Sequence, residues 1–264
     1  MNRSIKILTL NIGNPSPKRA LRQIEWLKSR DEDLFLLTET KNSEGCNLIE
    51  QYFSGNIFDF FTMPDQPKYF VSFPKSITGD LGVMCISKLP FEGVFHFFQP
   101  NSAFYSRLLE ICINFCGMSL FVSGAYVPSR DQSNEKIERK RDYIENFKNY
   151  IQRIQESSSV ICGDFNIVDR NHIPHYNTFK EWEYSFYDTI LDCGFIDAYR
   201  FCHPSKADYS WIGRMNDGYR YDYCFVSKAL CNHIKKCEFI HESRVLHLTD
   251  HSGVVVEITA KPNI

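Results

Sequence analysis

The chain has 264 residues, of which 43% are apolar, 15% aromatic and 23% charged, a composition typical of a globular protein with ample material for a core. Its formal net charge of −2 excludes the basic field of a general polyanion binder, so any contact with nucleic acid must come from local patches. No apolar run approaches the roughly 20 residues that a membrane-spanning helix needs, and we expect no membrane insertion.

The 10 cysteines are irregularly spaced and form no CxxC pair. Several lie in apolar, strand-like runs, which favours reduced and buried thiols in an intracellular protein over a secreted disulfide framework. The N-terminal stretch MNRSIKILTL enters a strand pattern directly, without the apolar segment of a signal peptide. We therefore expect a cytoplasmic location, or a nuclear one in a eukaryote.

Apolar runs rich in Ile, Val, Phe, Leu and Tyr predict β-strands along the whole chain. In chain order they are 5–12, 33–38, 69–73, 81–87, 104–114, 118–126, 158–164, 221–227, 236–241 and 253–259.

Three segments have the periodicity of amphipathic helices. The first begins at Ser16-Pro17, a good cap followed by proline at the first helical position. The second covers about 134–156, and the third covers about 177–192, with Gly194 suited to its C-terminal cap. So many strands with few, widely separated helices indicate two packed sheets with helices outside. We expect one domain over residues 1–264.

Several predicted strands end in a polar signature. Taken singly, each is more often a turn, a cap or solvated surface. Residues two apart on a strand point the same way, so Asp164 and Asn166 would project side by side if the extended conformation lasts that far. The recurring set across the chain is Thr9-Leu10-Asn11, Leu37-Thr38-Glu39, Gly124-Ala125-Tyr126, Gly163-Asp164-Phe165-Asn166, Tyr221-Asp222 and Thr249-Asp250-His251.

In this order, these residues resemble the endonuclease/exonuclease/phosphatase superfamily of metal-dependent phosphodiesterases. The pieces AYVPS (125–129), GDFNIV (163–168), GFIDAYR (194–200) and YSWIGRMNDGYRYDYCFVS (209–227) are most similar to its exonuclease III and abasic endonuclease branch. The resemblance implies an α/β (α+β) fold, a four-layer sandwich in which two packed mixed β-sheets are flanked by helices.

The resemblance also implies a cation site. Mg²⁺, with Mn²⁺ as a substitute, prefers oxygen ligands and acts as a Lewis acid on phosphoryl oxygens. Glu39 is then the principal ligand, and Asn11 and Asp250 assist. One departure affects this site, because Gly13 stands where many nucleases of the superfamily have an acidic residue.

The catalytic roles follow from the same resemblance. Asp164 orients or deprotonates the attacking water, or else binds a second metal ion. Asn166 donates to a phosphate oxygen or holds Asp164. His251, partnered by Asp222, donates to the phosphoryl oxygen, and Tyr126 contacts the phosphate or the leaving oxygen.

Four residues are candidates for substrate binding: Arg107, Trp211, Tyr219 and Arg220. The aromatic pair resembles a pocket for a flipped sugar, although both rings can equally belong to the core. Arg107 can pair with an active-site carboxylate or make a structural ion pair. The basic residues Arg130, Lys136, Arg139, Lys140 and Arg141 are interpreted as a solvated helix face, with a phosphate track, which Arg214 and Arg220 could join, as the alternative.

We therefore expect a Mg²⁺-dependent phosphodiesterase that acts on nucleic acid, DNA above all, with no obligate protein partner evident. The alternatives within the superfamily are a tyrosyl-DNA phosphodiesterase, an RNA nuclease or deadenylase, a phosphoinositide phosphatase and a sphingomyelinase. A catalytically inactive binding scaffold is a further alternative, but such proteins usually lose part of the catalytic set, and it is complete here.

Overall fold

Two six-stranded mixed sheets form the centre of the computed structural model, which describes residues 3–55 and 68–260. The spatial order of sheet I is β13 (Ile234–Ile240), β14 (Gly253–Ala260), β1 (Arg3–Asn11), β2 (Leu34–Thr40), β4 (Gly82–Ser87) and β3 (Phe70–Ser72). The order of sheet II is β5 (Gly93–Phe95), β6 (Leu108–Phe115), β7 (Met118–Tyr126), β8 (Ser159–Asp164), β12 (Asp222–Ser227) and β9 (Phe195–Asp197).

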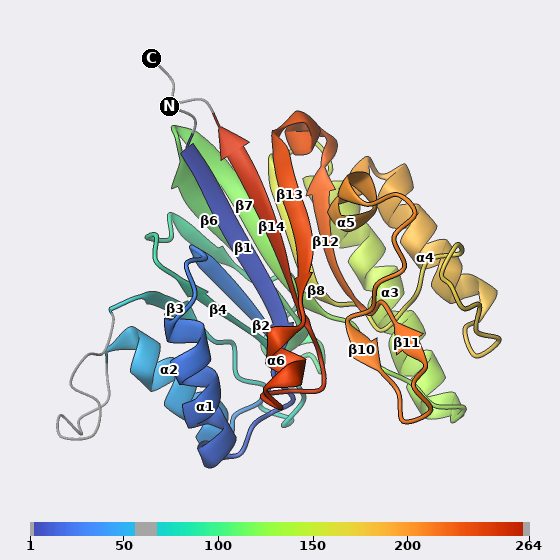
Figure 1. The fold of residues 1–264 in the computed structure, drawn as a ribbon, viewed down its shortest axis with the longest axis horizontal. Helices are drawn as coiled ribbons and strands as arrows, with labels where there is room; N and C mark the ends of the chain where they lie inside the picture. Colours follow the sequence, from blue (N-terminus) through green and yellow to red (C-terminus); the bar gives the residue numbers. More distant parts are fainter. Residues whose placement is uncertain (1–2, 56–67, 261–264) are drawn as a thin grey trace.

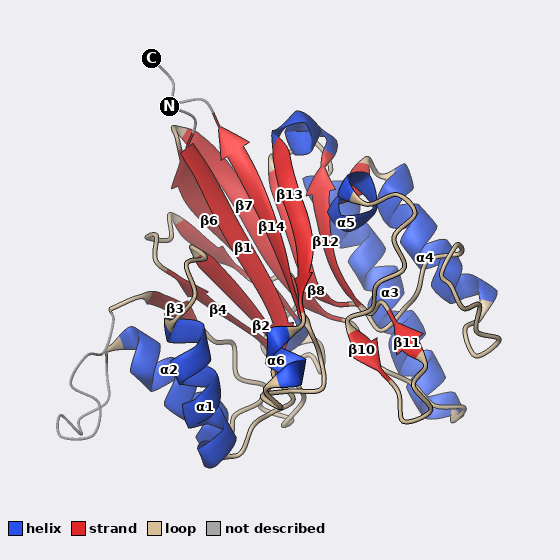
Figure 2. Cartoon of the chain, in the orientation of Figure 1, coloured by secondary structure: helices blue, strands red, loops and turns tan. Residues whose placement is uncertain are grey.

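Helices cover the outer face of each sheet (Figure 1). The helices α1 (Pro17–Lys28) and α2 (Glu44–Ser54) pack on sheet I, whereas α3 (Asn134–Ile154) and α4 (Glu181–Asp192) pack on sheet II. Figure 2 shows the resulting order of helices, sheet, sheet and helices, which confirms the predicted four-layer sandwich. No helix in residues 3–55 and 68–260 combines the length and the apolar character needed to cross a bilayer.

The same local unit builds the centre of both sheets. Strands β1 and β2 are parallel and are joined through α1, and β7 and β8 are parallel and are joined through α3. A parallel pair needs such a crossover, and it brings the carboxyl ends of both strands to one edge. All other strand pairs in the two sheets are antiparallel.

The layer between the sheets is apolar along most of its length. Alternate residues of the central strands face this layer, among them Ile7 in β1, Val122 in β7, Cys162 in β8 and Cys224 in β12. Continuing the same alternation to the strand ends reaches polar residues. The polar strand ends of the sequence therefore meet where the apolar core stops.

The strand predictions are confirmed with one correction. Residues 105–107 form a short 3₁₀ helix instead of the start of a strand, and β6 begins at Leu108. The strands that periodicity missed are very short: β5, β9, β10 (Trp211–Ile212) and β11 (Gly218–Tyr219). Two or three residues are too few for an alternating pattern to be recognised.

The three predicted helices are present, but the structure also contains helices that were not predicted. α1 begins as predicted after the Ser16 cap, and Gly194 follows α4 with a left-handed backbone, φ +84°. α4 starts at Glu181 and not near 177. Unpredicted helices are α2, α5 (Ala198–Cys202), α6 (Glu242–Val245) and a 3₁₀ helix, Lys228–His233.

Gly163 is the glycine on which the end of β8 depends. Its φ is +150°, and a Cβ atom there would lie 1.9 Å from the backbone oxygen of Ala125 on the neighbouring strand. Only glycine permits this approach of β8 to β7. The next residue is Asp164, so the close approach sets the position of a candidate catalytic carboxylate.

We predict that Gly163→Ala lowers the free energy of unfolding by at least about 2 kcal/mol, because the new methyl group must push β7 and β8 apart. Urea denaturation followed by circular dichroism measures the loss. The matched control is Gly253→Ala at the start of β14, where the nearest atom to a Cβ is 3.4 Å away and φ is ordinary. Equal stabilities of the two variants would contradict the prediction.

Candidate active site

The register of sheet II places three polar side chains in one row. Tyr126 pairs with Asp164 across β7 and β8, and Asp164 pairs with Asp222 across β8 and β12. Their alternation matches that of the inward-facing core residues, so all three side chains enter the layer between the sheets. They are 3%, 1% and 1% exposed, respectively.

Sheet I supplies Asn11 and Glu39 from the ends of β1 and β2. Asn11 is 1% exposed, and its Nδ2 donates to Asp164 Oδ2 across the layer at 2.9 Å. Glu39 would face away from the layer in a regular strand. A register shift between Thr38 and Thr40 and a left-handed backbone, φ +54°, turn it back. Its Oε1 accepts a hydrogen bond from the Tyr126 hydroxyl at 3.1 Å.

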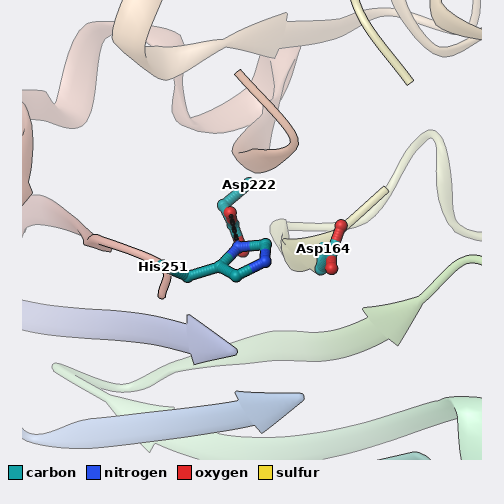
Figure 3. A group of neighbouring side chains, drawn as sticks. All are labelled: Asp164, Asp222 and His251. Carbon is teal, nitrogen blue, oxygen red and sulfur yellow. Dashed lines mark hydrogen bonds and ion pairs between the residues drawn. The ribbon is translucent and has the colours of Figure 1, made fainter. Parts of the chain in front are cut away.

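His251 and Asp222 form a buried ion pair. The segment before β14 brings the imidazole into the layer, and its Nδ1 lies 2.7 Å from Asp222 Oδ2. Burial alone would lower the pKa of His251, but the charge and hydrogen bond of Asp222 outweigh it and raise the pKa to about 10. The ring is therefore an imidazolium at neutral pH. Figure 3 shows Asp164 facing the imidazole from the side away from Asp222.

Asp164 is held by a hydrogen bond on each oxygen. Oδ2 accepts from Asn11, and Oδ1 accepts from the backbone N–H of Asn166 at 2.9 Å. Burial, followed by the negative charge of Asp222, raises the pKa of Asp164 to about 8, against the opposing effect of His251. In this surrounding Asp164 is the group best placed to exchange a proton near neutral pH.

The structure corrects the expected direction of Asn166. β8 ends at Asp164, and Asn166 has a left-handed backbone with φ +50°. Its side chain therefore does not project beside Asp164 as it would on a continuing strand. Instead, Nδ2 donates to the carbonyl oxygen of Val127 at 3.0 Å, and the residue acts on Asp164 through its backbone N–H.

The acidic groups at this end of the layer suit a hard divalent cation. Asp222 Oδ1 is buried and accepts no hydrogen bond from the part of the chain that the structure describes. Negative charges from Asp222 and Glu39 act together on the buried Asp164. A buried excess of carboxylates is the environment in which a cation stabilises a protein most.

Two sets of residues are candidate ligands for such a cation. The first is the predicted set of Glu39, Asn11 and Asp250, of which Asp250 is exposed. The second is Asp164, Asp222 and His251, whose potential ligand atoms lie within 4.8 Å of one another. Because the Asp222–His251 hydrogen bond occupies Nδ1 and keeps the imidazole charged, the second set is better explained as an ion pair beside a carboxylate.

Two features near Asn11 modify the predicted cation set. Asn11 Oδ1 accepts from the backbone N–H of Gly13 at 2.9 Å, so it has one lone pair left. Gly13 itself brings no carboxylate. Its carbonyl oxygen accepts a hydrogen bond from Arg19 Nη2 at 2.5 Å, which places a positive charge beside this turn.

Tyr126 and Arg107 form a unit at the edge of the site. Burial, followed by Glu39 and Asp164, raises the pKa of Tyr126 well above its usual range, so the phenol is a hydrogen-bond donor. The Arg107 guanidinium lies 4.8 Å from the centre of the Tyr126 ring, and its Nη1 donates to the Tyr126 carbonyl oxygen. Arg107 is 4% exposed and approaches Asp80 at 3.8 Å. It belongs to a 3₁₀ helix, not a strand, and supports Tyr126 from behind.

Aromatic rings lie beside His251 and Asp250. Trp211 pairs with His251 in an isolated β-bridge, and its Nε1 donates to Asp250 Oδ2 at 2.9 Å. The ring of Tyr219 lies 5.5 Å from that of Trp211 and stacks at 4.1 Å on Tyr176, which the sequence reading did not single out. The two predicted aromatic residues are thus half-buried at the site and lie outside the apolar core clusters.

The structure contradicts the predicted substrate contact of Arg220. Its side chain is 0% exposed, and Nη1 and Nη2 each donate at 2.6 Å, to Asp197 and Asp169 respectively. The guanidinium also lies over the ring of Tyr223 at 4.3 Å. Arg220 is therefore a structural cation that ties β12 to the segments carrying the two aspartates.

The solvated-face interpretation of the basic residues is wrong for two of them. Lys140 is 1% exposed and the Arg130 side chain is 4% exposed, and both form ion pairs with the buried Glu183. The sequence did contain a signal, because Lys140 lies three and four residues before Tyr143 and Ile144, on the buried face of α3. A lysine in phase with a core stripe indicates a buried partner.

Comparison with known proteins identifies relatives of similar length. A model of the Endonuclease/Exonuclease/phosphatase family matches residues 8–243. A Bacillus subtilis exodeoxyribonuclease is 24% identical over 250 residues, which cover 88% of this chain and 91% of that protein.

Solved structures share the fold. An AP endonuclease from Archaeoglobus fulgidus gives a TM-score of 0.75 at 24% identity, covering 96% of this chain and 98% of the other. A 3′ phosphatase from Neisseria bound to a product DNA hairpin gives 0.77 at 19% identity, covering 96% and 99%. At these identities the structural likeness establishes the fold.

We predict that Asp222→Asn lowers the pKa of His251 from its value of about 10, since burial is then opposed only by the charges of Asp164 and Asp250. An NMR titration of the His251 ring protons measures the change. Asp192→Asn, at the exposed end of α4, is the matched control. A His251 titration that is identical in both variants would show that Asp222 does not set its charge.

Proposed function

The chain belongs to the Endonuclease/Exonuclease/phosphatase family, and on this basis we propose that it is a phosphodiesterase of exonuclease III type that hydrolyses DNA. The observation that carries the proposal is the Asp222–His251 ion pair facing the buried Asp164. This arrangement offers a charged donor and a proton acceptor on one small site. The names of the relatives, an exodeoxyribonuclease, an AP endonuclease and a 3′ phosphatase, support the choice of DNA.

The proposal includes a divalent cation, Mg²⁺ with Mn²⁺ as a substitute, held by Glu39 and Asp250 with Asn11. The buried excess of carboxylates supports it. When bound, the cation would neutralise charge on the phosphoryl oxygens and on the leaving alkoxide as a Lewis acid. Glu39 Oε2 receives no hydrogen bond from the described residues and has the oxygen chemistry such an ion prefers.

Asp164 is the proton acceptor for the attacking water in this proposal. Its two oxygens are fixed by Asn11 and Asn166, so its remaining lone pairs keep constant directions. His251 cannot compete for this role, because its pKa near 10 keeps it protonated at neutral pH. A well-placed base contributes roughly 10²–10⁴-fold to the rate.

His251 and Tyr126 are the proton donors of the site. Asp222 occupies His251 Nδ1, which leaves Nε2 to donate to a phosphoryl oxygen as negative charge develops there. The Tyr126 phenol keeps its proton and now donates to Glu39. It can donate instead to the phosphate or the leaving oxygen. The site thus provides one acceptor and two donors, which is the inventory that hydrolysis by water requires.

The aromatic rings supply the substrate-binding surface in this proposal. Trp211 and Tyr219 flank His251 and are half-buried, so their faces can contact a sugar or a base. Stacking of a nucleobase on such a ring contributes about 1–3 kcal/mol and tolerates any sequence. This fits a chain of near-neutral net charge, which must bind nucleic acid through local contacts.

We predict that Asp164→Asn and His251→Gln each lower kcat by roughly 10²–10⁴-fold, because each removes a proton acceptor or donor from the reaction. The activity is measured on abasic-site duplex, 3′-recessed duplex, single-stranded DNA, RNA, 5′-tyrosyl DNA and inositol phosphate. Circular dichroism confirms folding, and Asp192→Asn is the control. Hydrolysis of inositol phosphate alone would refute the DNA proposal, and full activity of either variant would refute the assigned roles.

We also predict that EDTA abolishes cleavage and that Mg²⁺ or Mn²⁺ restores it. Because the pKa of Asp164 is about 8, about nine in ten molecules carry its proton at pH 7. A bound cation favours the carboxylate, so binding at pH 7 releases up to one proton, and the release falls towards zero above pH 9. Calorimetry in buffers of different ionisation enthalpy measures this. Asp164→Asn should release none, and equal release from the variant would exclude Asp164 as its source.

A further inference from the structure

A buried lysine lies behind the catalytic turn and takes no part in the chemistry proposed above. Lys140 of α3 is 1% exposed. Its Nζ donates to the backbone carbonyl oxygen of Asn166 at 2.7 Å and to Glu183 Oε1 at 2.6 Å. Removing an ammonium group from water costs several kcal/mol unless its hydrogen bonds are replaced. Tyr143 and Ile144, one turn further along the same face of α3, are buried core residues, so the charge itself needs an explanation.

The carboxylate that pairs with Lys140 is also buried and hydrogen-bonded. Glu183, 1% exposed, lies in the first turn of α4. Its carboxylate binds Lys140 through Oε1, and through Oε2 it accepts from Arg130 and from the backbone N–H of Lys180. Burial would raise the pKa of Glu183, but the charge of Lys140 and the hydrogen bonds from Arg130, Lys140 and the Lys180 backbone together outweigh it and lower the pKa, so the group is ionised. Four segments thus converge on one buried ion cluster, which we call the Lys140–Glu183–Arg130 cluster.

The residue that Lys140 contacts is the one that orients Asp164. Asn166 has the left-handed φ of +50°, which asparagine adopts more readily than most other residues, and three hydrogen bonds hold it there. Its N–H donates to Asp164 Oδ1, its side-chain amide to Val127, and its carbonyl accepts from Lys140. The lysine completes this set of restraints. It also lies close enough to Asp164 for direct electrostatic attraction.

We propose that Lys140 is a positioning residue for the reaction: it fixes the carbonyl of Asn166 and thereby the N–H that aims the carboxylate of Asp164. This rests on the proposed function for its catalytic consequence. Its geometric part, the restraint on Asn166, stands independently. The Lys140–Glu183–Arg130 cluster ties the lysine, which lies on α3, to α4 and to the segment after β7. The turn after β8 is therefore restrained by its contact with α3 and, through the cluster, by α4 and that segment.

Lys140→Met tests the geometric part. Methionine keeps the length and helix propensity of the side chain but cannot donate to Asn166. We expect amide hydrogen exchange of the Asn166 N–H to accelerate at least about ten-fold relative to Cys162 in the adjacent strand, which reports global stability. Lys148→Met, on the same helix, is the control, since its Nζ pairs only with Glu145 among the described residues and its side chain is 27% exposed. Unchanged exchange at Asn166 would overturn the proposal whether or not the protein cleaves DNA.

Steady-state kinetics tests the catalytic part. We expect Lys140→Met to lower kcat roughly 10–100-fold with KM changed less than about two-fold, because misplacement of a catalytic group affects the transition state more than binding. The triple variant Arg130→Met/Lys140→Met/Glu183→Met replaces all three charges of the cluster with apolar groups and should regain thermal stability without regaining kcat. Recovery of kcat together with stability would show a merely structural lysine. A wild-type protein that cleaves none of the substrates would refute the proposed function and leave the exchange result to decide the restraint on Asn166.

Discussion

Asp164 and Asp222 are cross-strand partners whose carboxylates are both about 1% exposed. Two like charges placed side by side in a low-dielectric layer repel strongly, and each also loses its hydration. The surrounding structure compensates in three ways. His251 becomes a cation against Asp222, Asp164 retains affinity for a proton, and Lys140 brings a positive charge behind the catalytic turn. These three features offset the electrostatic cost that arises because the sheet register places Asp164 beside Asp222.

The fold explains why the buried carboxylates meet at one edge of the two sheets. In both sheets a parallel pair is joined by a helix, and these pairs carry the polar strand ends to the same edge. The layer between the sheets is filled with apolar side chains up to that edge. Tyr126, Asp164 and Asp222 keep the inward orientation of the core residues that precede them on their strands. The side chains of the candidate site and those of the core are therefore consecutive members of one alternating pattern.

The sequence predicted what depends on local periodicity. The alternation of apolar residues located the strands and placed Asp164 and Asp222 at their ends. The alternation could not predict the orientation of Glu39, which a bulge and a left-handed backbone turn into the layer, or that of Asn166, which leaves the strand instead of continuing it. Arg220 was predicted to bind substrate and Lys140 to lie on a solvated face, because arginine and lysine are usually exposed. Their carboxylate partners are 23 to 51 residues away in the chain, and no local pattern encodes such pairs.

The orientation of Asp164 depends on the packing of the two sheets. Its Oδ1 is held by Asn166 within sheet II's own turn, but its Oδ2 is held by Asn11 from the opposite sheet. The two hydrogen bonds can both be short only at one separation of the sheets, and the apolar layer sets that separation. Protein interiors are close-packed, so a change of one methylene group in a core side chain shifts the residues that it contacts. The spacing of the core is therefore part of the active-site geometry, and residues such as Cys162 and Val122 act on Asp164 although they have no chemistry of their own.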